Sequence, residues 1–221
     1  MNSETVSRET WRAARGAGGA AATAFGAGLF LIGLLVLWID PALDRSLHAR
    51  WLLHADAPSL RWLRYLTELG GGTVLIPLAL CAAVLLRVRG DGRAALWLFA
   101  TIASGRLVVE GAKPVFGRLR PPEGDWLASA SSLSFPSSHS AGSMLTGLAL
   151  CLALGARRPA FVAALLFSVA VGATRVMLGM HWPSDVLAGW GFGLFWACGA
   201  AVLVRPRGPA WPCGRNAGDR A

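Results

Sequence analysis

The sequence contains little charge and almost no lysine. Only 15% of its 221 residues are charged, against roughly 25% in ordinary soluble domains. Lysine occurs once, as Lys113, so arginine carries nearly all of the positive charge, and 54% of the chain is hydrophobic. Such a composition excludes an ordinary soluble domain with a polar surface, and it predicts an integral membrane protein.

Cysteine is also scarce, and its spacing argues against a cysteine-based site. No two of the four cysteines form a C-x-x-C pair, and three of them fall in apolar runs. We therefore expect small packing residues rather than a metal cluster or a disulfide framework, and we predict neither a metal ion nor another cofactor. The four are Cys81, Cys151, Cys198 and Cys213.

Acidic residues are outnumbered: 12 Asp and Glu stand against 21 Lys and Arg, which gives a net charge of +9. A basic excess can indicate nucleic-acid binding, but here the positive charges lie mostly between apolar stretches. That arrangement is typical of loops that set membrane topology and face anionic lipid. The expected partner is therefore the bilayer and no nucleic acid, and the oligomeric state is left open.

Six apolar stretches predict an all-α integral membrane bundle of about six transmembrane helices. The first, fifth and sixth reach the length of about 20 residues that a spanning helix needs, and the other three must extend into their flanks. We expect a membrane domain over 20–205, an N-terminal segment over 1–19 and a short disordered tail over 206–221. The stretches are 20–39, 72–86, 94–109, 141–154, 160–178 and 186–204.

Positive charge predicts the orientation of these helices. Twelve arginines lie in the N-terminal segment, the loops after the second and fourth stretches and the tail, against eight basic residues in the opposite loops. The positive-inside rule then assigns both termini to the cytoplasm. The loops after the first, third and fifth stretches face outward, with an active site at the outer membrane–water interface of the cell membrane.

The first outward loop, residues 40–70, carries apolar residues at helical spacing with charges between them. We expect a helix that lies in the membrane interface, with Trp51 and Trp62 in the aromatic belt. His48 and His54 are interpreted as solvated loop residues, and so is Asp125 in the second outward loop.

Three polar clusters interrupt the apolar chain, and all of them fall on the predicted outward face. They cover residues 113–122, 135–140 and 174–185. Lys113, Arg120 and Arg175 are fixed cations, which a phosphate group needs around its charged equatorial oxygens. Arg175 ends an apolar stretch, where an unpaired charge is costly in lipid, so a bound phosphate would explain its position.

Helix starts supply hydrogen-bond donors to the same region. Ser137 and Ser138 precede the fourth apolar stretch, where an N-cap leaves free backbone N–H groups and the helix dipole favours an anion. The sixth stretch opens in a similar way, with Pro183 suited to a first helical turn.

Two histidines complete a reaction. His181 and Asp185 are four residues apart, a spacing that can bring a carboxylate to one imidazole nitrogen and leave the other free to attack phosphorus. His139, at another helix start, is suited to protonate the departing alkoxide and then to activate water. This set provides a nucleophile, an orienting acid, a general acid and a cationic cradle.

The three clusters resemble the signature of the type 2 phosphatidic acid phosphatase family, which shares its core with vanadium-dependent haloperoxidases. The family pattern is K-x6-R-P, then P-S-G-H, then S-R-x5-H-x3-D. The spacing is kept from Lys113 to Arg120, and again from Arg175 through His181 to Asp185.

The resemblance implies a six-helix membrane fold and a role for each matching residue. It implies His181 as the nucleophile, Asp185 as its support and His139 as the general acid. Two residues depart from the pattern, because Ser138 replaces the usual Gly and Thr174 the usual Ser. Ser138 still offers its backbone N–H to a phosphate, but its side chain now lies close to that site. The phosphate-binding residues implied are Lys113, Arg120, Ser137 and Arg175.

The leading function is a metal-independent membrane phosphatase that hydrolyses a lipid phosphate or diphosphate through a phosphohistidine intermediate. Phosphatidic acid, phosphatidylglycerol phosphate and a polyprenyl diphosphate are the expected substrates. The alternatives are a lipid phosphotransferase with the same intermediate, a vanadate-dependent haloperoxidase, and an anion transporter. A transporter would explain the cations, but not His139 or the pair of His181 and Asp185.

Three further charged residues belong to the same region. Arg106 and Glu110 are four residues apart in the third helix, and we expect them to form a structural pair; contact of Arg106 with the active site is the alternative. Arg118 occupies an unspecified position of the first cluster, where it suits a lipid headgroup contact as well as a role in the site.

Overall fold

The structure is a computed structural model that describes residues 16–130 and 132–204, and within these ranges it is helical with no strand. The expected tail (206–221) and all but the last four residues of the expected N-terminal segment (1–19) lie outside the described residues. The elements are α2 (Ala17–Ile39), α3 (Pro41–Trp51), α4 (Leu60–Leu69), α5 (Gly72–Val88), α6 (Gly92–Phe116), the 3-10 turn η1 (Glu123–Asp125), α7 (Ser138–Ala153), α8 (Arg158–Met177) and α9 (Pro183–Leu203).

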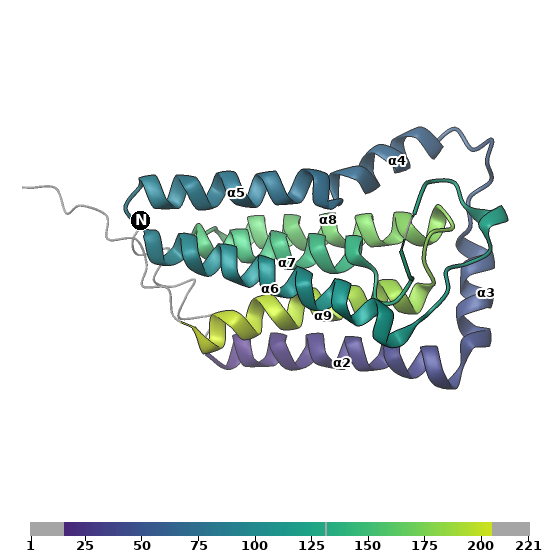
Figure 1. Cartoon of the computed structure of the whole chain (residues 1–221), viewed down its shortest axis with the longest axis horizontal. Helices are drawn as coiled ribbons and strands as arrows, with labels where there is room; N and C mark the ends of the chain where they lie inside the picture. Colours follow the sequence, from purple (N-terminus) through teal and green to yellow (C-terminus); the bar gives the residue numbers. More distant parts are fainter. Residues whose placement is uncertain (1–15, 131, 205–221) are drawn as a thin grey trace, which may run out of the picture.

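The six expected apolar helices are all present and run side by side in one bundle (Figure 1). They are α2, α5, α6, α7, α8 and α9. Five segments of the described chain are long and apolar enough to cross a membrane: α2, residues 60–88 across α4 and α5, α6, α8 and α9. The chain is therefore a multi-pass membrane protein.

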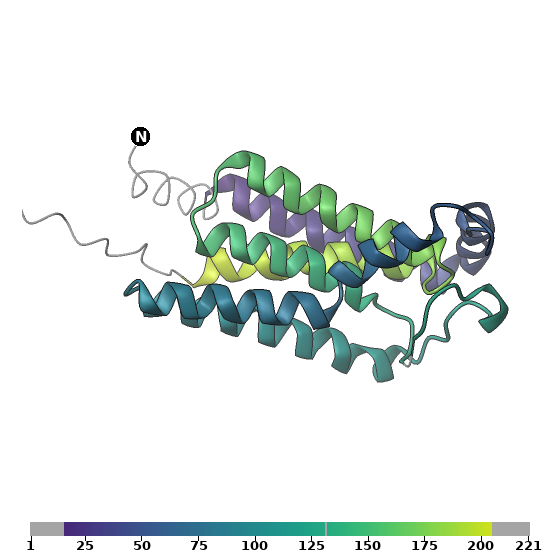
Figure 2. The same ribbon diagram turned by 90° about the horizontal axis from the view of Figure 1, so that it is seen from above.

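The remaining helix, α7, is the fourth of the six in chain order. It has 16 residues, fewer than the roughly 20 that a membrane span requires. It begins at Ser138, so the polar motif enters the helix as the sequence predicts. Its neighbours are α5, α6, α8 and α9, and it runs through the middle of the bundle (Figure 2). Most of its side chains are buried, because protein rather than lipid surrounds it.

The N-terminal helix packs very closely against the C-terminal one. A Cβ on Gly26 would lie 2.6 Å from the backbone nitrogen of Phe195, and one on Gly191 would lie 2.4 Å from that of Phe30. Small residues let membrane helices approach in this way and gain van der Waals contact. Helix α2 thereby fixes α9, whose first turn carries Asp185.

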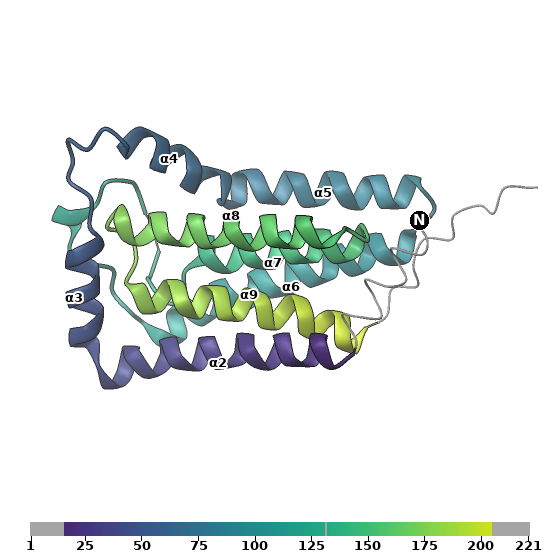
Figure 3. The same cartoon turned by 180° about the vertical axis from the view of Figure 1, so that it is seen from behind.

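The described ends of the chain, at α2 and α9, lie together at one end of the bundle, whereas α3 crosses the other end (Figures 1 and 3). The expected interface helix is in fact two helices, α3 and α4. In α3 the buried residues are Asp44 and His48, while Trp51 is 55% exposed. The polar side of α3 is buried because α3 packs on the ends of α8 and α9, and its place in the membrane interface stays a prediction.

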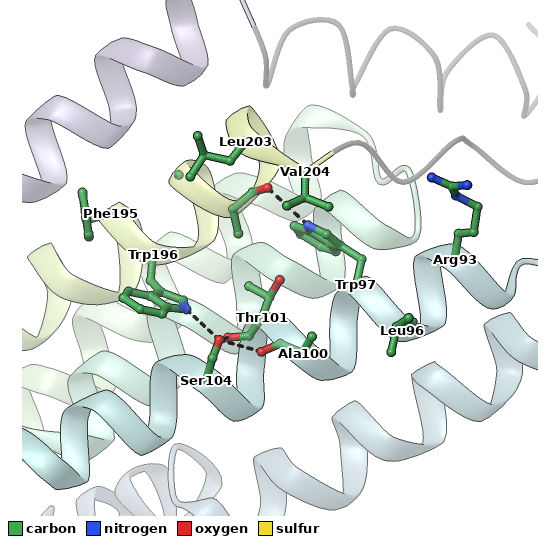
Figure 4. Close-up of a pocket in the computed structure, with 12 residues that line it drawn as sticks. Arg93, Leu96, Trp97, Ala100, Thr101, Ser104, Phe195, Trp196, Leu203 and Val204 are labelled. Carbon is green, nitrogen blue, oxygen red and sulfur yellow. Dashed lines mark hydrogen bonds between the residues drawn. The ribbon is translucent and has the colours of Figure 1, made fainter.

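An apolar cavity of about 760 Å³ lies between α6 and α9, at the end of the bundle that carries the described termini (Figure 4). Its two indole N–H groups are satisfied: Trp97 donates to the carbonyl of Ala200 (3.3 Å) and Trp196 to the hydroxyl of Ser104 (3.1 Å). Arg93 is the charged residue of its lining. No candidate catalytic residue lines this cavity, so the chemistry belongs to the opposite end.

Candidate active site

The three polar clusters meet at the end of the bundle that α3 crosses. The first follows from the end of α6, the second opens α7, and the third joins α8 to α9. A backbone hydrogen bond from Ser134 to the carbonyl of Arg118 (2.8 Å) and one from Ser137 to the carbonyl of Asp185 (3.1 Å) tie these segments together. Residues up to 72 positions apart in the sequence are thus brought to one site, as the motif order predicts.

His181 lies in the turn between α8 and α9 and is only 1% exposed. Its Nδ1 is 3.4 Å from the Asp185 carboxylate, and its Nε2 is 3.0 Å from a guanidinium nitrogen of Arg120. A guanidinium can only donate, so Nε2 is the accepting nitrogen and the imidazole proton sits on Nδ1, toward Asp185. Burial, and then the charge of Arg120, hold the pKa of His181 well below its usual value, so the ring is neutral at pH 7.

Asp185 is fully buried and its carboxylate is held by several donors. The hydroxyl of Ser134 donates to it at 2.5 Å and the backbone N–H of Trp182 at 2.9 Å. The guanidinium of Arg118 donates to its other oxygen. With one oxygen facing His181 and both oxygens bonded, the carboxylate has a fixed orientation.

Arg118 links this carboxylate to the helix across the end of the bundle. It donates to Asp44 of α3 at 2.5 Å and to the hydroxyl of Ser184 at 2.7 Å. Asp44 is 1% exposed and also accepts from the backbone N–H of Ser184 (2.9 Å). Arg118 is therefore an internal bridge and not a headgroup contact, and Asp44 is a member of the site region that the sequence did not reveal.

His48 also differs from expectation. It is 4% exposed, and its Nε2 lies 3.1 Å from the Asp125 carboxylate. Its ring lies against that of Trp182, with centroids 5.2 Å apart. It is thus a buried contact between α3 and the loop after α6, whereas His54 is exposed as predicted.

Arg120 lies over the turn that carries His181 and is held by backbone carbonyls. It donates to the carbonyl of Met180 at 2.5 Å and to that of Ser132 at 2.6 Å. These bonds aim the guanidinium at His181, where a phosphate under attack by Nε2 would carry its charge.

Lys113 is 5% exposed near the end of α6. Its ammonium donates to the hydroxyl of Ser132 (2.8 Å) and lies 3.2 Å from the carboxylate of Glu110. Glu110 also accepts from the hydroxyl of Ser138 (2.6 Å). Lys113, Glu110 and Arg120 line an open outer cavity of about 810 Å³.

The expected pair of Arg106 and Glu110 makes no direct bond in the described chain, and the two side chains interact only through their charges. Glu110 bonds Lys113 and Ser138 instead, and Arg106 makes no hydrogen bond or ion pair with any residue in the described ranges. Lys113, three residues further along the helix, and Ser138, on another helix, are the better partners for this carboxylate.

The start of α7 carries the second histidine. Ser137 is its N-cap, accepting from the backbone N–H of Ser140 at 3.4 Å, and Ser138 is its first residue. His139 is half-buried, and its side chain has no hydrogen-bond or ionic partner within 16–130 and 132–204. Its Nε2 faces the start of α5, where a Cβ on Gly71 would lie 3.4 Å away.

Arg175 closes the set of cations from the side of α8. It is 3% exposed, donates to the hydroxyl of Thr67 at 3.1 Å, and leaves its Nε without a partner in the described chain. An unpaired N–H of a buried guanidinium is costly. The predicted phosphate-binding cations, Lys113, Arg120 and Arg175, thus surround the two histidines with donors still available.

Comparison with known proteins gives one family. The family model of the PAP2 superfamily matches residues 94–209. The lipid A 1-phosphatase of Rhizobium etli is 31% identical over 138 residues, which are 54% of this chain and 57% of that protein. The undecaprenyl-diphosphatase of Sulfolobus acidocaldarius is 29% identical over 150 residues, 66% of this chain and 70% of that protein.

The fold has a solved counterpart. The crystal structure of a transmembrane PAP2-type phosphatidylglycerolphosphate phosphatase from Bacillus subtilis matches with a TM-score of 0.71 and 24% identity. The match covers 80% of this chain and 94% of that one. This likeness to the solved structure is one of helix arrangement. The chain spans only a little over half the length of the lipid A 1-phosphatase that it matches.

Proposed function

The chain belongs to the PAP2 superfamily, and from this premise we propose that it is a metal-independent membrane phosphatase that removes the terminal phosphate from a lipid phosphate or diphosphate. One observation carries the proposal: a neutral, buried His181 presents Nε2 as an acceptor beside Arg120, with Asp185 behind Nδ1. An imidazole held in this tautomer is a nucleophile. The relatives are named for lipid A, undecaprenyl diphosphate and phosphatidylglycerol phosphate, and these names agree with the proposed substrate class.

The first step forms an N–P bond and breaks a P–O bond. Nε2 of His181 attacks phosphorus, and the electron pair of the broken bond leaves with the lipid oxygen. That oxygen takes a proton from His139, whose protonated ring is favoured once the anionic phosphate lies among the cations. Arg120, Lys113 and Arg175 offer N–H donors to the oxygens of the phosphoryl group as it is transferred. Asp185 stabilises the positive charge that the imidazole gains.

The second step returns the enzyme to its starting state. His139, now neutral, takes a proton from water as that water attacks phosphorus, and the N–P bond breaks with release of inorganic phosphate. The backbone N–H groups at the start of α7, beyond the N-cap Ser137, are donors to an anion at this site.

The orientation in the membrane is part of the proposal. Arg87, Arg89 and Arg93 flank the turn between α5 and α6, at the end that carries the described termini and away from the two histidines. The positive-inside rule assigns that end to the cytoplasm. The active site would then face outward, and a membrane-impermeant thiol reagent should label a cysteine introduced at Glu123 but not one at Arg89 in intact cells.

The catalytic proposal is tested by phosphate release from the purified protein in detergent with EDTA present. The substrates are phosphatidic acid, phosphatidylglycerol phosphate and a polyprenyl diphosphate, each assayed with the wild type and with His181→Ala. Activity in the wild type that the variant loses supports the assignment. Equal activity in both would remove His181 as the nucleophile, and transfer of phosphate to an added alcohol in preference to water would make the enzyme a transferase.

A further inference from the structure

Arg106 is a cation in a membrane-spanning helix, and among the described residues the charge of Glu110 acts on it without a direct contact. It lies on α6, seven residues before Lys113, which at 1.5 Å per residue is about 10 Å deeper in the bundle. Its side chain is half-buried and forms no hydrogen bond or ion pair with the described residues. A charge in this position is costly unless a partner or a ligand meets it.

The guanidinium of Arg106 lies between the start of α5 and the second turn of α7. A Cβ on Gly72 would be 2.6 Å from its Nη2, and one on Gly142 would be 2.8 Å from its Nη1. Gly71, the residue next to Gly72, is the one that Nε2 of His139 faces. The guanidinium and the imidazole therefore face neighbouring residues of one turn.

Arg106 also stands where an apolar groove meets the site. The groove has a volume of about 350 Å³ and lies between α5 and α6, with Ile76 and Phe99 in its lining and Arg106 and Glu110 as its charged residues. Ile76 is 41% and Phe99 53% exposed on the face that lipid would cover. Arg106 and Glu110 also line a smaller cavity that reaches Ser138, beside His139.

These contacts define a direction for the substrate. The general acid protonates the oxygen that leaves with the lipid, so His139 marks the leaving-group side of the bond that breaks. The groove between α5 and α6 then suits the apolar tail of the lipid. Arg106 lies between the groove and His139, on the path of the leaving group, while Lys113 and Arg120 face the phosphoryl group that is transferred.

We propose that Arg106 binds a second phosphate group of the substrate, on the leaving-group side of the cleaved bond. The inference rests on the proposed phosphatase function and narrows its substrate class. In a lipid diphosphate this group is the inner phosphate, which departs as a lipid monophosphate after His139 protonates the bridging oxygen. In a lipid whose terminal phosphate is linked through glycerol, it is the phosphodiester. A guanidinium binds either group through paired N–H donors.

The experiment compares two matched pairs of lipids. One pair is a prenyl diphosphate and the corresponding prenyl monophosphate; the other is phosphatidylglycerol phosphate and phosphatidic acid. The value of kcat/KM is measured for the wild type, Arg106→Met, Arg106→Lys and Arg93→Met. Arg93 is the matched control because it lies on the same helix, at the distant cavity (Figure 4).

Loss of a hydrogen bond to a charged group predicts a fall of roughly tenfold to a hundredfold for Arg106→Met on the lipid with a second phosphate. Its matched monophosphate should change by less than about threefold, and Arg106→Lys should recover part of the loss. A difference within the prenyl pair would identify the inner phosphate of a diphosphate as the group that Arg106 binds. A difference within the glycerol-linked pair would identify the phosphodiester. Arg93→Met should leave all four rates unchanged.

Two results would overturn the inference. Equal losses within both pairs would assign Arg106 a structural role, and no loss in either pair would show that nothing binds it. A wild type inactive on all four lipids would instead remove the proposed function, and the inference with it. Binding of a non-hydrolysable prenyl bisphosphonate gives a second readout, since Arg106→Met should weaken this inhibitor more than the matched monophosphonate.

Discussion

The two histidines open two helices in very different surroundings. His181, before α9, is 1% exposed and has a partner at each ring nitrogen. His139, in the first turn of α7, is half-buried and its ring has no partner in the chain as described. In the proposed mechanism, the group that attacks in one direction is thus held from several sides, while the group that meets a departing oxygen is left open toward the substrate.

Support for His181 continues through further layers. Asp185 orients its ring, Arg118 and Ser134 hold Asp185, and Asp44 of α3 holds Arg118. Among the described residues nothing comparable supports the ring of His139, whose neighbour Ser138 bonds Glu110 instead. The supporting hydrogen bonds are therefore concentrated around the proposed nucleophile, and the predictions below test this asymmetry.

The largest effect should come from His181→Asn. Removing the nucleophile should lower kcat by roughly 10⁴-fold or more, and acid-labile phosphate should no longer appear on the protein when the reaction is quenched rapidly. His54→Gln, at an exposed histidine, is the control and should behave as the wild type. Retained phosphoprotein in the His181 variant would transfer the nucleophilic role to another residue.

His139→Gln should have the next largest effect. Loss of a general acid costs about 10²- to 10⁴-fold, and the cost depends on the leaving group. A lipid phosphate needs a proton on its departing alkoxide, whereas nitrophenyl phosphate releases a stable phenolate. The variant should therefore lose much more activity on the lipid than on nitrophenyl phosphate. Equal losses on both would contradict the general-acid role.

Asp44→Asn tests the outermost layer around His181. The substitution keeps the shape of the side chain but removes the charge that faces Arg118, and we expect kcat to fall roughly tenfold, as for outer-layer partners in other sites. KM should hardly change, since Asp44 does not face the outer cavity. Asp40→Asn, at the exposed N-cap of α3, is the matched control. A higher KM with an unchanged kcat would refute a positioning role for Asp44.

These residues also show what the sequence could predict. Apolar length located all six helices, and motif spacing identified the segments that meet, because both signals are local. Asp44 was missed because its partner Arg118 lies 74 residues away, and an acid in an amphipathic loop looks the same whether solvated or buried. The four-residue spacing of Arg106 and Glu110 predicted a pair, but the direct bonds of the Glu110 carboxylate go to Lys113 and Ser138, and Arg106 acts on it only through its charge.

The charge state of His181 gives a fourth test. Its pKa lies well below the usual value, through burial and then through Arg120, so the ring should stay neutral as the pH falls through about 6.5, where an ordinary histidine is half protonated. With four histidines in the chain, nitrogen NMR of imidazole-labelled protein can follow each one. Arg120→Met should raise the pKa of His181, because a neighbouring positive charge is removed. A ring already protonated near pH 6.5 in the wild type would contradict the tautomer argument.

The smallest effect should come from Ser138→Gly, which restores the usual residue of the family motif. Glycine keeps the backbone N–H at the start of α7, so phosphate binding should persist. The loss is one hydrogen bond, from the Ser138 hydroxyl to Glu110 (2.6 Å), worth about 1 kcal/mol. We expect kcat/KM to stay within about threefold of the wild type. Ser137→Gly is the contrasting variant, because it removes the buried N-cap and should cost stability, seen as a lower Tm in detergent. If Ser138→Gly instead lowered activity as much as His139→Gln does, the start of α7 would need its own bond to Glu110, and the segment that carries His139 would be as firmly constrained as the one that carries His181.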